Sequence, residues 1–383
     1  MISNKKSCKV CIFSTLHDAF DNRIFHKEAR AIYAAGYDVT LIACRDKDEI
    51  SDGIKIIALH PAKNRFTRMT FMAVKVFVIA IKQRADIYHF HDPELIGVAL
   101  LLKLSTRAKI IYDVHEDTPK SVLSKEWINI HIRDFTSLVF DKIEKLLSRY
   151  FDCVFAATVS IADNFKKGNV VLLANYPDIG RFLKAEKDIL SKGIIKNKEY
   201  TLVYCGGLTK IRGIKEIVLS LGFIDFAYNV KLKLAGQFND TGYEKEVRGL
   251  KEWDRVDYLG HISKEKVIEN LYIADCGLVC LWPEPNHIES LGDKLLEYMA
   301  AGLPVVASNF PLWKKIVEGS DCGICVNPMD PGDIARAVEF LTKNTENAKQ
   351  MGKNGRKAVL ERYSWEKESE KLKEIYDKLC IVH

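Results

Sequence analysis

The stretch ESLGDKLLEYMAAGLPVVAS occupies residues 289–308 and combines a loop, a helix and a strand. Its apolar pattern predicts a helix over Lys294–Ala301 and a buried strand over Pro304–Ala307. Glu289 lies in the loop before the helix, and seven residues separate it from Glu297 inside the helix. Backbone N–H groups and the helix dipole make such an N-terminus a binding site for phosphate. Because the two carboxylates can bind hydroxyl groups on either side, the stretch predicts a site for a diphosphate that carries sugars.

Strand-like and helix-like segments alternate through the whole chain. Such alternation is typical of parallel sheets with helices on both faces. The pattern restarts at Tyr200 after a segment, Pro177–Lys198, that contains proline, glycine and lysine as a linker would. We therefore predict an α/β fold of two Rossmann-like domains that face each other across a cleft, 1–180 and 181–364. A C-terminal helix, 365–383, is predicted to pack back toward the first domain.

The individual elements follow from local apolar periodicity and from turn residues at their ends. Parallel sheets bind ligands outside the carboxyl ends of their strands, so the loops that follow the strands are the expected positions of the chemistry. Strands are predicted over Lys9–Ser14, Val39–Ala43, Ile54–Leu59, Ile87–Phe90, Ile110–Tyr112, Cys153–Ala157, Tyr200–Cys205, Val230–Ala235, Val256–Leu259, Cys276–Leu281, Pro304–Ala307 and Gly323–Val326, and helices over Asn22–Ala35, Phe71–Ile81, Ile214–Ser220, Lys294–Ala301 and Trp365–Leu379.

The composition is that of an ordinary globular protein, with 48% hydrophobic and 28% charged residues and a net charge of +6. Residues 1–183 contain 27 basic and 21 acidic side chains, so the whole excess lies in the first half, which we expect to meet an anionic partner. The start is polar, and no apolar run reaches the ~20 residues of a membrane span. We therefore predict a cytoplasmic protein whose thiols in strand-like runs, including those of Cys8 and Cys11, act as small apolar groups.

Three short motifs could indicate metal binding, but their settings argue against it. Cys8 and Cys11 are three residues apart in a strand, so their side chains point to opposite faces. Cys322 and Cys325 have no supporting cluster of histidines. The sequence Asp46-Lys47-Asp48 resembles a metal–nucleotide motif of a different fold, and it lies in a charged loop after the second strand. We predict no metal site and no cofactor.

Several segments together resemble one enzyme family. The sequence GDKLLEYMAAGLPVVAS resembles the E-x7-E region of the family 4 retaining glycosyltransferases, whose fold is called GT-B. The similarity extends to DNRIFHKEARAIYAAGYDVTLI (21–42), HFHDPEL (89–95), YDVHEDTP (112–119) and CGGLTKIRGIKEIV (205–218). It thus covers nearly the whole chain and implies a metal-independent enzyme that moves a sugar from a nucleotide-sugar to an acceptor.

The resemblance also implies roles for individual residues. His115 and Glu289 are the expected catalytic residues, with His115 near the anomeric carbon and Glu289 on the donor sugar. Glu297 is expected to bind the ribose, and Arg212 and Lys294 the diphosphate. The remaining expected contacts are Gly206, Gly207, Ser290, Leu291 and Gly292 for the donor, and Asn22, Arg23, His91, Asp92 and Glu116 for the acceptor.

One position departs from the family pattern. Gly206-Gly207-Leu208 stands where the family often has Gly-Arg-Leu, so one phosphate contact is missing. Either Lys210 or Lys294 replaces it, or the amides of the Gly-Gly loop do. Asn22 and Arg23 also have two interpretations, since Asp21 can act as an N-cap for a helix that starts there.

The proposed donor is a UDP-sugar with a hexose, and the acceptor a saccharide or lipid-linked saccharide of a cell-surface glycan. Two alternatives remain open, namely a nucleotide-sugar-binding subunit without turnover and a sugar-nucleotide epimerase of the same fold. A dinucleotide oxidoreductase is disfavoured because no G-x-G-x-x-G follows the first strand. No aromatic and basic module indicates nucleic-acid binding.

A basic apolar segment adds a hypothesis about membranes. Residues 63–84 contain six basic side chains and no acidic one, interleaved with aromatic and aliphatic residues. Arg68, Lys75 and Lys82 recur every seven residues, and 127–150 has a similar mixture. Such segments can lie on an anionic membrane surface, although a core helix with basic ends would show the same pattern.

Overall fold

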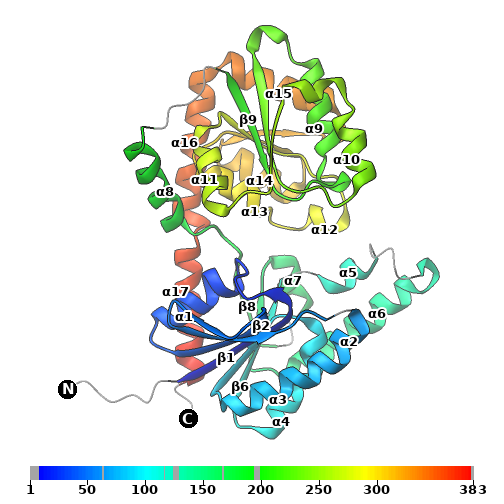
Figure 1. The fold of residues 1–383 in the computed structure, drawn as a ribbon, viewed down its shortest axis with the longest axis vertical. Helices are drawn as coiled ribbons and strands as arrows, with labels where there is room; N and C mark the ends of the chain where they lie inside the picture. Colours follow the sequence, from blue (N-terminus) through cyan, green and yellow to red (C-terminus); the bar gives the residue numbers. More distant parts are fainter. Residues whose placement is uncertain are drawn as a thin grey trace. The chain divides into compact units, whose positions relative to one another are not determined.

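A computed structural model describes residues 8–62, 64–115, 117–123, 129–165, 168–193 and 199–380. The chain forms two compact units, one made of Met1–Asn175 with Trp365–His383 and the other of Tyr176–Ser364 (Figure 1). We placed the first boundary at 180/181 and expected a linker over Pro177–Lys198. That segment instead contains a helix, α8 (Ile179–Ser191), whose Ile179 and Phe182 are buried in the second unit.

The first unit is built on an eight-stranded sheet in the order β3-β4-β2-β1-β5-β6-β7-β8. Its strands pair in parallel, except that β3 runs antiparallel to β4. The two edge strands β3 and β8 have three residues each and were not predicted, because so short a segment carries little periodicity. The strands are β1 (Lys9–Asp18), β2 (Asp38–Cys44), β3 (Glu49–Ser51), β4 (Ile54–Leu59), β5 (Ile87–Phe90), β6 (Lys109–Val114), β7 (Cys153–Ala156) and β8 (Val170–Leu172).

Helices cover both faces of this sheet. Alternate residues of β1 enter two separate cores, since Val10 and Ile12 pack with η1, α1 and α17, whereas Cys11 and Phe13 pack with α3, α4 and α7. The segment η1 is wound as a π-helix that continues directly into α1. The helices are η1 (Ile24–Ala29), α1 (Arg30–Ala34), α2 (Arg65–Thr67), η2 (Arg68–Met72), α3 (Ala73–Gln83), η3 (Pro93–Leu95), α4 (Ile96–Ser105), α5 (Thr118–Leu123), α6 (Ile130–Leu147), η4 (Ser148–Tyr150), α7 (Val159–Asn164) and α17 (Trp365–Cys380).

The second unit is built on a six-stranded parallel sheet in the order β11-β10-β9-β12-β13-β14. Helices α8, α11, α13, α14 and α16 pack with one core and α9, α10 and α15 mainly with the other. Its strands are β9 (Tyr200–Cys205), β10 (Val230–Ala235), β11 (Val256–Gly260), β12 (Cys276–Val279), β13 (Val305–Ser308) and β14 (Gly323–Val326). Its helices are α8, η5 (Lys210–Arg212), α9 (Ile214–Ser220), η6 (Leu221–Phe223), η7 (Phe226–Tyr228), α10 (Thr241–Arg248), η8 (Lys251–Arg255), α11 (Lys264–Ile273), α12 (Pro285–Ile288), α13 (Asp293–Ala300), α14 (Pro311–Gly319), α15 (Pro331–Lys343) and α16 (Thr345–Arg362).

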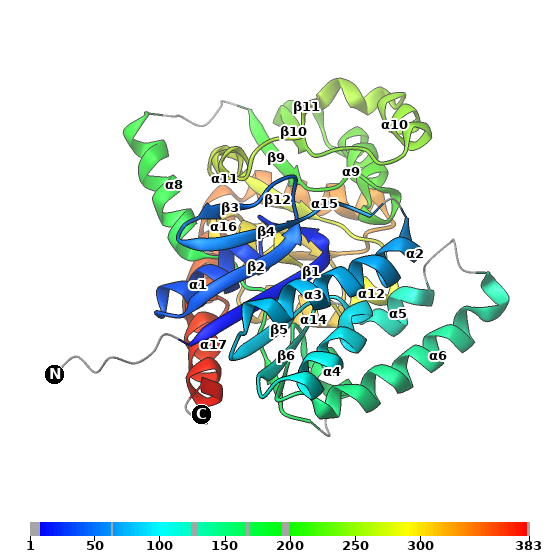
Figure 2. The same cartoon turned by 60° about the horizontal axis from the view of Figure 1, so that its bottom comes forward.

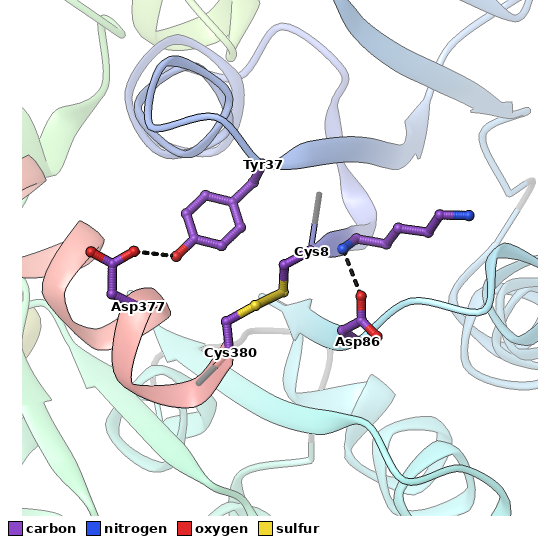
Figure 3. The surroundings of a disulfide bond; sticks show 6 residues. Cys8, Tyr37, Asp86, Asp377 and Cys380 are labelled. Carbon is purple, nitrogen blue, oxygen red and sulfur yellow. Dashed lines mark hydrogen bonds between the residues drawn. A yellow bond between two sulfur atoms is a disulfide. The ribbon is translucent and has the colours of Figure 1, made fainter. Parts of the chain in front are cut away.

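The C-terminal helix α17 is covalently attached to the first unit. Cys380 forms a disulfide with Cys8, which immediately precedes β1, and their Cα atoms are 6.6 Å apart (Figure 3). Beside it, the Tyr37 hydroxyl donates a hydrogen bond of 2.6 Å to Asp377 (Figure 3). Our prediction that Cys8 is a free apolar thiol was therefore wrong, because its partner lies at the other end of the chain. Cys11, Cys322 and Cys325 are unbonded thiols.

Candidate active site

A cationic loop follows β9 in the second unit. Gly206 and Gly207 have no side chains, and this leaves room for those of Lys294 and Arg212. A Cβ on Gly206 would collide with the Lys294 side chain, and one on Gly207 would lie 3.8 Å from Arg212 Nε. A hydrogen bond of 3.1 Å from the Tyr204 hydroxyl to the Gly207 carbonyl fixes the backbone of this loop. Two cationic side chains thus lie along the Gly-Gly loop, which supports the substitution of Lys294 for the missing arginine.

Charge and burial act together on Lys294. Burial and the nearby Arg212 guanidinium lower the pKa of its ammonium to about 8, although Glu297 opposes them. Two neighbouring cations disfavour each other unless an anion lies between or beside them. Binding of an anion next to Arg212 and Lys294 would therefore relieve the repulsion between these two cations.

The helix α13 begins next to this loop. Gly292 is its N-cap, and no side chain caps its first turn. A Cβ on Gly292 would lie 2.5 Å from the Trp313 ring, and the Trp313 indole N–H donates to the Ser290 carbonyl at 2.8 Å. Packing on Trp313 thus fixes the backbone of 290–292 at the start of the helix, where amides and dipole favour an anion.

Glu297 lies one turn further along α13. Its side chain is half-buried. Burial raises the pKa of the nearby Cys205 thiol to about 12, and the negative charge of Glu297 adds to this effect. The Cys205 backbone N–H donates to the Tyr298 hydroxyl at 2.9 Å, which ties α13 to the end of β9. Glu289 is exposed at the C-terminal end of α12.

A buried polar cluster lies at the carboxyl ends of β5 and β6 in the first unit. Arg23 donates to both carboxylate oxygens of Asp113, at 3.0 and 2.9 Å, and its Nε also lies 2.8 Å from Glu28. His91 Nδ1 lies 2.9 Å from His115 Nε2, and the two rings are stacked with an interplanar angle of 6°. The side chains of Glu28, His91 and Asp113 are 0% exposed, whereas that of His115 is 20% exposed, so His115 is the outward end of the cluster.

The charges in this cluster shift its titration strongly. Burial opposes ionisation of Asp113, but Arg23 and the histidines outweigh it and hold its pKa well below the ordinary value. Burial and the Asp113 charge raise the pKa of Glu28 well above the ordinary value, against the effect of Arg23. Burial lowers the pKa of His115 to about 3; the Asp113 charge opposes this shift, and Arg23 and His91 add to it, so this imidazole is neutral at physiological pH.

The same cluster contains donor atoms that could bind a metal ion. Donor atoms of Glu28, His89, His91 and Asp113 lie within 4.8 Å of one another, and histidine with carboxylate suits zinc or manganese. However, both oxygens of Asp113 already accept hydrogen bonds from Arg23, and a metal ion would lie beside that guanidinium. The residues therefore fit an ion-paired polar cluster rather than a cation site.

Asp92 has a structural position beside the second half of β1. Its carboxylate accepts hydrogen bonds from the Ser14 hydroxyl at 2.9 Å and from the backbone N–H groups of Thr15 and Leu16. Asp92 is 2% exposed. It therefore holds the end of β1 against η3.

Two family models match this chain. The model for family 4 glycosyltransferases matches residues 22–171, and the model for group 1 glycosyl transferases matches 186–358. The chain belongs to the family 4 glycosyltransferases. The first match contains the histidine cluster apart from Tyr376, and the second contains the cationic loop and α13.

Several related proteins match this glycosyltransferase over most of its length. An uncharacterized glycosyltransferase from Methanocaldococcus jannaschii is 26% identical, and the match covers 85% of this chain and 82% of that protein. Sucrose-phosphate synthase from Thermosynechococcus elongatus has a similar fold, with a TM-score of 0.77, 20% identity and coverage of 98% and 100%. The Anabaena protein HepE in complex with UDP-glucose has a TM-score of 0.70, 16% identity and coverage of 97% and 99%. These two structures have the GT-B fold that we predicted.

The structure gathers the predicted donor residues of the glycosyltransferase around the end of β9 and the start of α13. For the acceptor, it favours the capping role of Asp21, whose carboxylate accepts from the backbone N–H groups of Arg23 and Ile24 at 2.8 and 3.0 Å. Arg23, His91 and Asp92 are buried with partners of their own, and this argues against the direct acceptor contact that we expected. Asn22 is half-buried, and Glu116 lies outside the described residues.

Sequence reasoning missed four members of the histidine cluster, namely Glu28, His89, Asp113 and Tyr376. A detectable signal existed for two of them, because a histidine and an aspartate inside strands β5 and β6 are rarely buried without polar partners. Glu28 and Tyr376 look like ordinary helix residues until the fold brings them to the sheet.

Proposed function

We propose that this glycosyltransferase is a retaining, metal-independent enzyme. It transfers a hexose from a nucleotide-sugar to a saccharide or lipid-linked saccharide in cell-surface glycan biosynthesis. The observation that supports this proposal most strongly is the pairing of Arg212 and Lys294 along the Gly206-Gly207 loop, next to the uncapped start of α13. A structure of the same fold holds UDP-glucose, so a uridine nucleotide is the first donor to test.

In the transfer reaction, negative charge develops on the diphosphate that leaves the sugar. The bond between the anomeric carbon and the phosphate oxygen breaks, and a bond to the acceptor oxygen forms on the same face of the sugar. The acceptor proton passes to the departing phosphate oxygen, and Arg212, Lys294 and the α13 amides stabilise the diphosphate charge. Glu297 binds the ribose and Glu289 the sugar. If NMR of the product showed the inverted anomer, retention would be wrong.

A panel of UDP-, GDP-, ADP- and dTDP-sugars tests the donor site by thermal stabilisation, with and without EDTA. We expect one base to raise the melting temperature in both conditions. The Glu297→Ala variant should lose most of that shift because a charged hydrogen bond of about 1.5–3 kcal/mol is removed. Glu361→Ala, on an exposed part of α16, is the control. Stabilisation without transfer to any acceptor would favour a binding subunit, and conversion of the donor alone would favour an epimerase.

We also propose that the first unit binds the cytoplasmic surface of an anionic membrane. Among the described helices, none is long and apolar enough to cross a membrane. Helix α3 buries Val76 and Ala80 against the sheet, so the core-helix interpretation holds for that face. Figures 1 and 2 both show α3, α4 and α6 along one side of the sheet. These helices, together with α2 and η2 just before α3, contain large exposed apolar side chains: Phe66, Met69, Phe71, Val74, Leu101, Leu104, Ile132, Phe135, Leu138, Ile143 and Leu146.

Basic side chains accompany this apolar surface. Lys75, Lys82 and Arg84 are exposed. Arg68 does not belong with them, because it forms an ion pair with Glu94 at 2.5 Å and is only 22% exposed, so the predicted stripe of Arg68, Lys75 and Lys82 loses one member. Apolar contact with lipid plus attraction to anionic headgroups is the usual basis of interfacial binding.

Vesicle sedimentation tests this surface. We expect the protein to pellet with anionic vesicles at low salt and much less with neutral ones. The triple variant Phe66→Ser, Phe71→Ser, Phe135→Ser should bind about a thousandfold more weakly, because each of the three aromatic side chains contributes on the order of 1.5–3 kcal/mol when fully inserted, and about 1.4 kcal/mol corresponds to a factor of ten. Phe223→Ser, which alters a phenylalanine that is 65% exposed in the second unit, is the control. Equal pelleting of both variants would count against the proposal.

A further inference from the structure

Helix α6 exposes an apolar stripe and buries polar side chains. The stripe consists of five side chains that are 38–69% exposed, namely Ile132, Phe135, Val139, Ile143 and Leu146. At 3.6 residues per turn, these five lie within about 80° of one another around the helix. Among the described residues of α6, the buried side chains are those of Ser137 and Glu144, which lie about 140–160° from the centre of the stripe. A helix that covers a core has the opposite arrangement, with its apolar face inward.

Two hydrogen bonds attach the polar face of α6 to the first unit. The Tyr112 hydroxyl on β6 donates to the Glu144 carboxylate at 2.5 Å. The Ser137 hydroxyl donates at 2.7 Å to the Pro119 carbonyl on α5, which packs beside α6 (Figure 2). Tyr112 precedes His115 by three residues, which span about 10 Å of extended chain, and Pro119 follows it by four. Helix α6 therefore adjoins the segment that carries His115.

The charges around the stripe favour an anionic bilayer over a second copy of this chain. Lys142 is exposed and lies about 60° from the centre of the stripe, whereas Asp134 and Asp141 lie about 140–160° from it. The segments 65–84 and 96–109, which contain α3 and α4 on the same side of the sheet, have eight basic residues and no acidic one. Two copies would bring these basic surfaces together, whereas anionic headgroups would neutralise them.

We propose that α6 lies in the surface of an anionic bilayer and that the acceptor of this glycosyltransferase is a saccharide carried on a lipid of that bilayer. This inference rests on the proposed function and selects one of its two acceptor classes. A bilayer that covers the stripe passes close to the segment 112–119. The saccharide headgroup of a lipid can then reach His115 while its chains stay in the membrane, and a free saccharide would gain nothing from this arrangement.

The acceptor class is tested with the donor that the thermal panel selects, radiolabelled in its sugar. One sample contains a lipid extract of the cells that make the protein, in vesicles of phosphatidylglycerol and phosphatidylcholine. The other sample contains the water-soluble saccharides of the same cells. We expect a labelled, butanol-soluble product in the first sample. Label in water-soluble saccharides alone would overturn the proposal and leave the proposed transfer standing.

Variants of α6 separate contact with the bilayer from transfer itself. Phe135→Ser combined with Ile143→Ser should raise the KM for the vesicle-bound acceptor about a hundredfold and leave kcat unchanged, because each inserted side chain contributes about tenfold to binding. Phe223→Ser combined with Phe226→Ser alters two exposed phenylalanines of the second unit and should change neither constant. The same KM in both double variants would contradict the proposal.

A spin label on α6 provides a readout that does not need transfer. With anionic vesicles, a nitroxide attached to Val139→Cys should become protected from a water-soluble nickel complex, relative to the unaltered protein treated in the same way. A nitroxide attached to Asp134→Cys, on the other side of the helix, should stay accessible. If the label at 139 stayed in water, the proposal would be wrong whether or not transfer occurs. If it were protected but neither extract were labelled, the proposed transfer would be wrong, although the bilayer contact of α6 would stand.

Discussion

At the residue scale, the two candidate sites differ in how their charges are held. In the second unit, Arg212 and Lys294 are neighbouring cations, and Lys294 has a lowered pKa. In the first unit, Arg23 is bound on both sides by Asp113 and Glu28, and the cluster is buried. A charge that is already paired attracts a ligand only weakly. Two neighbouring like charges, in contrast, are stabilised when an anion binds beside them. This difference supports the proposal that the donor binds at the cations of the second unit.

The pKa of Lys294 predicts a pH dependence of donor binding. Burial and Arg212 favour the neutral amine, so below about pH 8 the ammonium is present, and above it the free enzyme loses this charge. The diphosphate keeps its own charge across this range. The Kd for the nucleotide-sugar should stay constant up to about pH 8 and then rise about tenfold by pH 10, because a charged hydrogen bond is lost.

Titration calorimetry between pH 6.5 and 10 measures this effect. Lys294→Met should bind weakly at every pH and show a flat profile. Lys210→Met, which alters an exposed lysine of the same loop, should keep the wild-type profile. A steep profile in Lys294→Met would assign the titration to another group.

At the element scale, α17 is attached to the first unit by several independent contacts. The Glu368 carboxylate accepts a hydrogen bond from the Ala174 backbone N–H at 3.0 Å, Trp365 and Leu372 are buried in the core, and Cys380 is bonded to Cys8. The helix also provides Tyr376 to the histidine cluster. Its anchoring therefore contributes to the stability of this unit.

Reduction of the disulfide should destabilise the first unit. The bond joins residues 372 positions apart, and a disulfide that closes a long loop stabilises by about 2–4 kcal/mol, largely by restricting the unfolded chain. We expect a reductant to lower the melting temperature by about 5–10 °C. Cys380→Ser should melt at the lower temperature with or without reductant.

A second cysteine variant makes this measurement specific. Cys325→Ser removes a half-buried free thiol in the second unit and should remain as sensitive to reductant as the unaltered protein. A melting temperature that does not respond to reductant in the unaltered protein would show that the bond does not contribute to stability in solution.

At the scale of the whole molecule, local pattern was sufficient for much of the fold. The predicted strands Ile54–Leu59, Ile87–Phe90, Tyr200–Cys205, Val230–Ala235 and Gly323–Val326 have these same bounds in the structure. Parallel strands buried on both faces are continuous apolar runs, which makes them easy to recognise. Helix α8 was missed because its surroundings resemble a linker, and the edge strands were missed because they are short.

The sequence by itself determined the family, the two parallel-sheet units and the positions of the proposed donor residues, because the cationic loop and the start of α13 are each contiguous in the chain. Only the tertiary structure decided the partners of the buried charges. Arg23 meets Asp113 across 90 residues, and His89 meets Tyr376 across 287. Such pairs leave no periodic pattern along the chain. They form because one face of the sheet and the helices that cover it bring distant polar side chains together in a buried space, where a polar group is costly unless it meets another polar group.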